Sequence, residues 1–135
     1  MNFTAPEPPN TQQQLLWAFQ RLAQQQGARL DLQRLAASVA ALTPSQLQGG
    51  EALNALCTAM DVPAPRWLRK PDRVLMPVLA HTDLHGWGLV VDRNPDGLWV
   101  MHTPMGPQMV GEEALRKRCA LTQIGPRASL RFGLL

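Results

Sequence analysis

The sequence predicts one α+β domain, in which N-terminal helices pack on an antiparallel β-sheet. Apolar residues recur at helical spacing in the first half of the chain, and short apolar runs separated by turn residues make up the second half. Pro63 and Pro65 divide the two halves. Helices followed by antiparallel strands are typical of the α+β class, and 135 residues are the length of a single domain.

The chain begins with a proline-rich stretch, residues 1–10, which we expect to form an extended N-terminal arm. A helix is predicted over residues 11–26, with Thr11 as its cap and Gly27 as its stop. Its apolar residues follow the period of an amphipathic helix and are Leu15, Leu16, Phe19, Leu22 and Ala23. This segment is the most regular helical pattern in the sequence.

Two further helical regions are predicted before the prolines. Asp31 can cap a second helix that runs to Ala40, with one apolar face. Thr43 suits the start of a third segment, which we expect to break at the glycine pair 49–50 and to resume over residues 51–61.

The second half predicts six strands and one short helix. Its centre is a three-strand antiparallel meander over residues 74–103, whose connections are an Asp-Leu-His-Gly-Trp stretch and an Asn-Pro-Asp-Gly turn. The other elements are a strand near residues 66–70, a strand near 108–110, a helix over 111–118 and a strand over 120–124. The meander carries all three histidines of the chain near the ends of its strands: His81, His85 and His102.

Composition restricts the function classes. The net charge of +3 and the pI near 9.5 come from scattered basic residues without interleaved aromatics, which argues against a nucleic-acid-binding surface. Cys57 and Cys119 have neither CxxC nor metal-ligand spacing, so we expect reduced thiols in a cytosolic setting. No apolar stretch approaches the ~20 residues of a membrane helix and no signal-peptide pattern is present, so we expect a soluble domain.

The order of these elements and several local strings resemble the bacteriocin-processing cysteine peptidases. The resemblance covers roughly residues 11–125 and is greatest to the degenerate peptidase-like domain at the N-terminus of type I secretion ABC transporters of the haemolysin exporter kind. The strings that carry it are Leu-Thr-Pro-Ser (42–45), Ala-Leu-Cys-Thr-Ala-Met (55–60), Met-Pro-Val-Leu (76–79), Gly-Trp-Gly-Leu-Val-Val (86–91), Asp-Gly-Leu-Trp-Val (96–100) and Gly-Glu-Glu-Ala-Leu (111–115). It implies a papain-like fold, with the nucleophile helix packed against the sheet.

The resemblance also implies that the catalytic residues of active members are replaced here. The cysteine nucleophile falls at Gln14, and a carboxamide cannot act as a nucleophile. The catalytic histidine falls at Trp87, or at His85 if the preceding turn slips by two residues. The aspartate falls at the third strand's end, at His102. On this register the nucleophile, base and orienting carboxylate are not assembled.

The glutamine that stabilises the oxyanion in active members is displaced as well. Its position falls at Pro8, and Gln12 or Gln13 would take the role only with a shifted register. The resemblance therefore implies a chain that is not an enzyme and needs no cofactor.

The remaining candidate residues are interpreted structurally. Cys57 lies on an apolar helix face and is predicted to be buried, and Cys119 is predicted to be structural and far from the histidines. The histidines lack a carboxylate or cysteine in a matching position, so no metal site is expected. Trp17 and Trp99 are predicted core residues. Trp87 stands between two glycines, which we expect to leave its ring uncovered for binding.

By resemblance, we expect a non-catalytic peptidase-like domain that docks the unfolded, RTX-type export substrate of a type I secretion system, at the cytoplasmic face of the bacterial inner membrane. Trp87, His85 and His102 are the expected substrate contacts. The partners would be the secreted protein and the transmembrane and nucleotide-binding domains of the transporter, toward which residues 126–135 would form a basic linker near the inner leaflet.

Two alternatives remain open at this point. The first is an active leader-peptide cysteine peptidase with an atypical site, such as Cys57 or Cys119 with His85. The second is an adaptor or immunity-like protein that binds one folded partner. Selective labelling of a cysteine at neutral pH would support the first, and capture of a folded partner would support the second.

Overall fold

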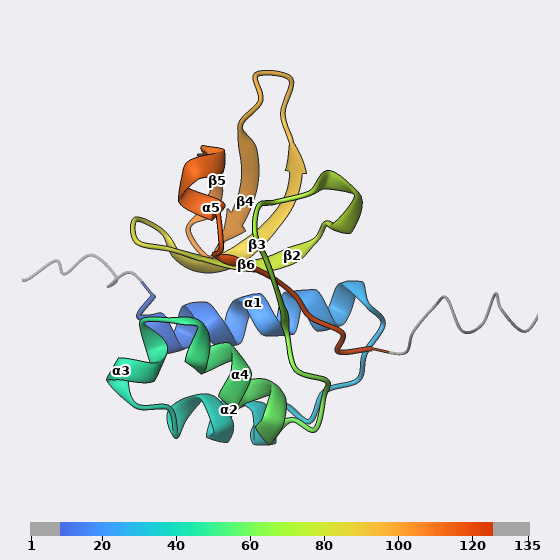
Figure 1. Cartoon of the computed structure of the whole chain (residues 1–135). Coiled ribbons are helices and arrows are strands. Elements are labelled where there is room, and N and C mark those ends of the chain that lie inside the picture. Colours follow the sequence, from blue (N-terminus) through green and yellow to red (C-terminus); the bar gives the residue numbers. More distant parts are fainter. Residues whose placement is uncertain (1–8, 126–135) are drawn as a thin grey trace, which may run out of the picture.

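In the computed structural model, residues 9–125 are described and form a mixed α+β arrangement with five α-helices and a six-stranded antiparallel sheet. Helix α1 (Thr11–Gln25) lies directly against the sheet, and α2 (Leu32–Ala40), α3 (Pro44–Leu47) and α4 (Gly50–Ala59) lie on the other side of α1 (Figure 1). The predicted α+β class, with N-terminal helices on an antiparallel sheet, is confirmed.

The sheet has the strand order β1-β6-β2-β3-β4-β5. Its strands are β1 (Arg66–Leu68), β2 (Val78–Thr82), β3 (Gly86–Arg93), β4 (Trp99–Thr103), β5 (Gly106–Val110) and β6 (Cys119–Leu121). A 3-10 turn, η1 (Arg73–Leu75), precedes β2, and a short helix, α5 (Glu112–Leu115), joins β5 to β6. The predicted meander corresponds to β2, β3 and β4, and each other predicted strand is present within a few residues of its expected place.

The start of α1 differs from the expectation by one residue. Asn10, not Thr11, is the cap: its side chain accepts from the backbone N–H of Gln13, and the Gln13 side chain accepts in return from the backbone N–H of Asn10. This reciprocal pair satisfies two N–H groups that the helix leaves without internal partners. The stop is confirmed at Gly27, which adopts a φ of 68° that few other residues tolerate.

The β3–β4 turn has the predicted place and chemistry. The backbone N–H of Asn94 donates to Leu98 O at 2.8 Å, and the Asn94 side chain accepts from Leu98 N at 2.9 Å. Gly97 has a φ of 84°. Asparagine suits this hairpin because its side chain bonds to nearby backbone, and glycine suits it because it adopts the left-handed conformation readily.

Both faces of the sheet are buried, by different partners. The face toward α1 contributes Leu79, Trp87, Leu89 and Ala120 to a core shared with all four N-terminal helices. The opposite face contributes Val78, Ala80, Val90, Trp99, Met101 and Cys119 to a second core with Leu115 of α5. Trp99 is a core residue as predicted, but it packs on the face opposite α1, whereas Trp17 is only partly buried.

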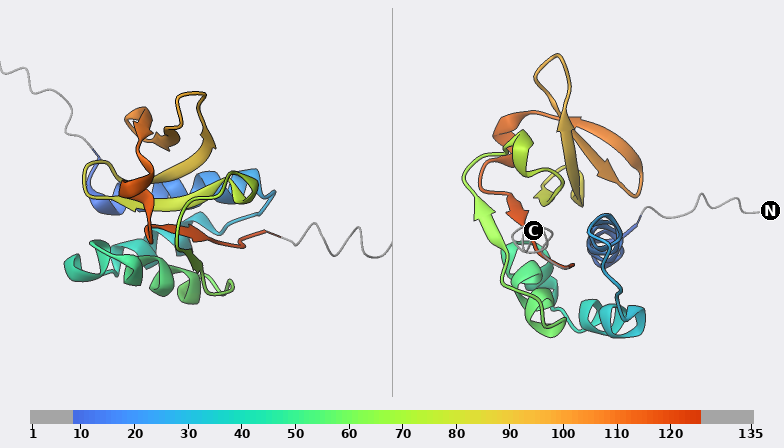
Figure 2. Two further views of the ribbon diagram at one scale, coloured as in Figure 1. Left: turned by 45° about the horizontal axis from the view of Figure 1, so that its top comes forward. Right: turned by 90° about the vertical axis from the view of Figure 1, so that its right-hand side faces the viewer.

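The views in Figure 2 agree on this layering: the sheet covers one side of α1, and α2 and α4 lie beyond it. The end of β6 is fastened to the end of α1 by Gln26, whose side chain donates to Thr122 O at 2.7 Å and accepts from the N–H groups of Ile124 and Gly125. The end of α1 is thus joined to the segment that follows the last strand.

Residues 1–8 of the predicted arm and the predicted linker at 126–135 lie outside the described residues. Within residues 9–125, none of the helices combines the length and the apolar character needed to cross a bilayer.

Candidate functional site

The side chain of Gln14 joins the first turn of α1 to the start of β3. The capping pair at Asn10 fixes this turn, and the backbone N–H of Gln14 donates to Asn10 O at 2.9 Å. The Gln14 carboxamide then donates from Nε2 to Pro9 O at 3.3 Å and accepts at Oε1 from the backbone N–H of Trp87 at 3.4 Å. Two positions 73 residues apart in the sequence are therefore adjacent in the structure.

Gly86 makes this approach sterically acceptable. It has a φ of 70°, and a Cβ atom built on it would overlap Gln14 Oε1. A residue with a side chain would therefore be strained by its own backbone and would displace the carboxamide. The contact as a whole holds a neutral amide between two backbone segments, and an amide can neither attack a carbonyl carbon nor transfer a proton near neutral pH.

The ring of Trp87 is not where the sequence predicted it. The residue is fully buried, at 0% exposure, and belongs to the core between sheet and helices. Its Nε1–H donates to the backbone oxygen of Leu47, at the end of α3, at 3.4 Å. The expectation of an uncovered ring at a binding surface is wrong. Helices α1 and α3, which are far from Trp87 in the sequence, cover the ring, and the two neighbouring glycines give no sign of this.

His102 lies at a groove between α1 and the edge of the sheet, which we call the α1 groove. It pairs with Leu89 across β3 and β4, so both side chains lie on the sheet face that α1 covers. The groove has a volume of 230 Å³. Its lining comes from one face of α1 and from strands β3 to β5: Trp17, Arg21, Gln25, Leu89, His102, Thr103, Gly106 and Pro107.

The α1 groove lies along the same face of α1 as Gln14, although Gln14 is not one of its lining residues. Residues 14, 17, 21 and 25 follow one face of an α-helix, because each successive pair is three or four positions apart. The guanidinium of Arg21 lies over the Trp17 ring at 5.3 Å from its centroid. A second hollow on this helix face shares Trp17 and Arg21 and adds Gln20 and Gln24. The surface therefore combines an aromatic ring, a cation, an imidazole and several carboxamides.

His85 lies apart from that groove. It is in the turn between β2 and β3, where its backbone N–H donates to Thr82 Oγ1 at 2.9 Å. It lines a separate cleft of 380 Å³ with Met109, Glu113 and Arg118. The three predicted substrate contacts are therefore not brought together: His102 lines the α1 groove, His85 lines another cleft, and Trp87 is in the core.

His81 was assigned no role from the sequence, yet it is the histidine with the most specific surroundings. It lies directly opposite Trp87 in the β2–β3 pair, with the two rings 5.1 Å apart and tilted by 55°. Arg118 places Nη1 3.3 Å from His81 Nδ1 and bonds through Nη2 to Asp83 at 2.7 Å. Because a guanidinium can only donate, His81 Nδ1 must accept, which requires a neutral ring.

The electrostatics of His81 agree with that geometry. Burial, followed by the charge of Arg118, lowers the pKa of His81 below its ordinary value, and the nearby Asp83 opposes this only in part. The connection predicted from the sequence, residues 83–87, is two residues too long. The strands are joined by only three residues between Thr82 and Gly86, and this register places His81 opposite Trp87.

Neither thiol has the surroundings of a nucleophile. Cys57 and Cys119 are both at 0% exposure, and burial raises the pKa of each to about 12. Their expected structural role therefore agrees with their surroundings. Cys119 is nearer to the histidines than expected, since it pairs with Ala80 beside His81, but it belongs to the opposite face of the sheet. Neither cysteine lines the cleft that holds His85.

Across residues 9–125, no three histidine, cysteine, aspartate or glutamate side chains are grouped closely enough to hold a metal ion.

Comparison of the chain with protein-family models, curated proteins and solved structures gave no match. The resemblance to peptidase-like domains therefore stays a prediction that rests on the sequence.

Proposed function

We propose that this protein is a non-catalytic, peptidase-like domain of a type I secretion ABC transporter, which docks the unfolded export substrate before translocation. The observation that carries the proposal is the contact of Gln14 with the backbone of Trp87. These are the positions at which the resemblance puts the nucleophile and the histidine of active members. A papain-like fold requires these two positions, one on the first helix and one on the sheet, to be neighbours.

The replacement of both residues supports binding without cleavage. On the register that the resemblance implies, a carboxamide stands at the nucleophile position and a buried indole at the histidine position. Both thiols are buried, which raises the pKa of each to about 12. The atypical peptidase remains an alternative with little support, because it would need a thiolate beside His85. Nothing in the geometry specifically favours the adaptor for a folded partner.

The α1 groove is the surface that we assign to docking. Its lining begins at Trp17, one helical turn after Gln14, to which the resemblance assigns the nucleophile position. Its aromatic and proline residues, Trp17 and Pro107, offer apolar contact, and the carboxamide of Gln25 can bond to peptide backbone. His102 is the one sequence-predicted contact within it, and we drop Trp87 and His85 from the docking site.

Docking of this kind is weak and reversible. Ordering a disordered chain costs ~2 to 5 kcal/mol of the gross interaction energy, which leaves little net affinity for a groove of this size. A weak contact suits a substrate that must be released into a translocation path. The remaining partners in this proposal are the membrane-spanning and nucleotide-binding parts of the transporter, which would place the domain at the cytoplasmic face of the inner membrane.

A pair of histidine variants tests the docking surface. The probe is a fluorescein-labelled peptide of glycine-rich RTX nonapeptide repeats, which bind Ca²⁺ as they fold and are kept unfolded by a chelator. We expect the unfolded probe to bind by fluorescence anisotropy, and His102→Ala to weaken binding about fivefold, the equivalent of roughly 1 kcal/mol.

His85→Ala is the matched control, because it removes the same side chain from the separate cleft. It should leave the affinity unchanged. Equal losses in both variants, or no loss in His102→Ala, would exclude the α1 groove as the docking surface.

A further inference from the structure

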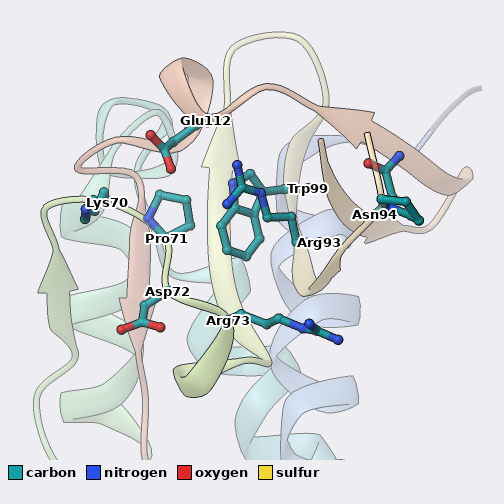
Figure 3. Close-up of a pocket in the computed structure, with 9 residues that line it drawn as sticks. Lys70, Pro71, Asp72, Arg73, Arg93, Asn94, Trp99 and Glu112 are labelled. Atoms are coloured by element: carbon teal, nitrogen blue, oxygen red, sulfur yellow. The ribbon is translucent and has the colours of Figure 1, made fainter. Parts of the chain in front are cut away.

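A larger cleft lies away from the α1 groove, and we call it the hairpin cleft. It has a volume of 620 Å³ and is lined by the 70–73 segment, the β3–β4 hairpin and the first residue of α5 (Figure 3). It shares no lining residue with the α1 groove. Trp99 in its lining belongs to the second core, on the sheet face opposite α1.

The charged residues of this cleft are only partly compensated by one another. Arg73 is paired with Asp92, with 2.8 Å between Nε and Oδ1, and Glu112 is paired with Arg116 at 3.3 Å. The Asp72 carboxylate accepts from the backbone N–H of Val74 at 3.0 Å.

Two cations of the lining have no ion-pair partner among the described residues. Within residues 9–125, neither Lys70 nor Arg93 forms an ion pair. The Arg93 guanidinium lies over the Trp99 ring, 5.6 Å from its centroid, and uses Nε to donate to Gly97 O at 3.2 Å. Its two terminal nitrogens remain available as a planar pair of donors.

Trp99 supplies a second, independent indication of a ligand. Its side chain is only 2% exposed, and among the described residues its indole Nε1–H has no acceptor. Buried indole N–H groups are usually hydrogen-bonded, since leaving one unpaired costs stability. The lining thus holds two cations and one carboxylate, Asp72, that form no ion pair among the described residues, and the unsatisfied N–H of Trp99 is buried beside them.

We propose that the hairpin cleft binds a small molecule that carries an oxyanion, either a carboxylate or a phosphate. The oxyanion would be held by the guanidinium of Arg93 and the ammonium of Lys70. Trp99 Nε1 is inaccessible to solvent in this structure, so a side-chain shift on binding would be needed for one of the ligand's oxygen atoms to accept from its N–H. A guanidinium fixed on an aromatic ring offers two parallel donors that match the geometry of either group. The volume is that of a site for a small organic ligand and exceeds what a lone ion needs.

Nuclear magnetic resonance of the ¹⁵N-labelled full chain tests this site directly. The Trp99 indole N–H resonance, assigned from through-bond spectra, reports on a new hydrogen bond by moving downfield. The probes are succinate and glycerol 3-phosphate, with succinamide and glycerol as their uncharged counterparts. We expect a saturable shift with at least one anion, at a Kd of about 1 mM or tighter, and the anion that binds identifies the group.

Three exposed-residue variants separate the site from general charge attraction. Arg93→Gln should weaken binding about tenfold, and Lys70→Gln several-fold. Arg29→Gln removes the same charge from an exposed position outside the cleft and should leave the Kd unchanged. The proposal is overturned if neither anion gives a saturable shift, if the uncharged counterparts bind as well, or if Arg29→Gln weakens binding as much as Arg93→Gln.

Discussion

Single side chains decide what the area around Gln14 can do. The carboxamide fills the space between the start of α1 and the backbone of β3, and the buried indole of Trp87 lies on the same face of the sheet, in the core toward α1. Neither group titrates, so the chemistry of this region depends on its neighbours. His81, whose ring lies 5.1 Å from that of Trp87, is held neutral by the donor Arg118.

The surroundings of His81 predict that the free energy of unfolding depends on pH. Its pKa is lowered in the folded protein, so the unfolded chain binds the proton more tightly. The stabilisation from the neutral ring is therefore complete above the unfolded value near pH 6.5, and it is lost as the pH falls toward the folded pKa. Urea unfolding at a series of pH values from about 8 to about 5.5 should show a falling free energy of unfolding.

Two variants identify the group responsible. His81→Gln should flatten this slope, whereas His102→Gln, at an exposed strand position, should leave it in place. A slope that survives in His81→Gln would show that another group titrates in this window.

At the scale of elements, the packing of α1 against β3 depends on Gly86. Its substitution by alanine should cost stability twice, once for the left-handed backbone and once for the displaced Gln14 carboxamide. Gly27→Ala is a matched reference, because Gly27 has a φ of 68° against 70° for Gly86 and no atom near the added Cβ. We expect Gly27→Ala to lower the free energy of unfolding by about 1 to 2 kcal/mol, and Gly86→Ala to lower it by about 0.5 to 1.5 kcal/mol more.

A double variant isolates the contact. In a Gln14→Ala background, Gly86→Ala should cost no more than Gly27→Ala does, because the atom that it would displace is gone. The free energies come from urea unfolding of the four variants and the parent chain. Equal costs for Gly86→Ala with and without Gln14 would mean that the carboxamide does not hold α1 against β3.

The elements themselves were largely predictable, because caps, glycine stops and turn residues act within a few positions. Asp31, Gly27 and the Asn94–Gly97 turn all have the role that the sequence predicts. Both Asn10 and Thr11 suit the cap of α1, and each has a glutamine three residues on. Asn10 is the cap because Gln13 returns its bond, whereas Gln14 bonds to Pro9 and Trp87 instead.

The candidate site was less predictable because long-range packing forms it. Gly86 and Gly88 suggest an open ring at Trp87, yet these glycines admit neighbouring groups: a Cβ on Gly88 would strike His102 O of β4. The ring is covered by α3, whose Leu47 oxygen accepts its N–H from 40 residues away. The sequence of residues 86–88 alone therefore does not predict that the Trp87 ring is buried.

For the molecule as a whole, the two cores separate two surfaces. The core between sheet and helices supports the α1 groove, and the core on the far face supports the hairpin cleft. A chain docked along α1 would therefore leave the hairpin cleft free. The docking of an unfolded substrate without cleavage remains the central proposal, and it is a property of the entire domain.

The most direct test is a titration of the ¹⁵N-labelled domain with the RTX-repeat peptide, first with a chelator and then with Ca²⁺, while mass spectrometry follows the peptide. The account predicts backbone shifts at the α1 groove, around Trp17, Arg21 and His102, with the unfolded peptide only, and an intact peptide throughout. Binding of the folded form alone would favour the adaptor for a folded partner. Cleavage of the peptide by the domain would contradict the account and restore a peptidase.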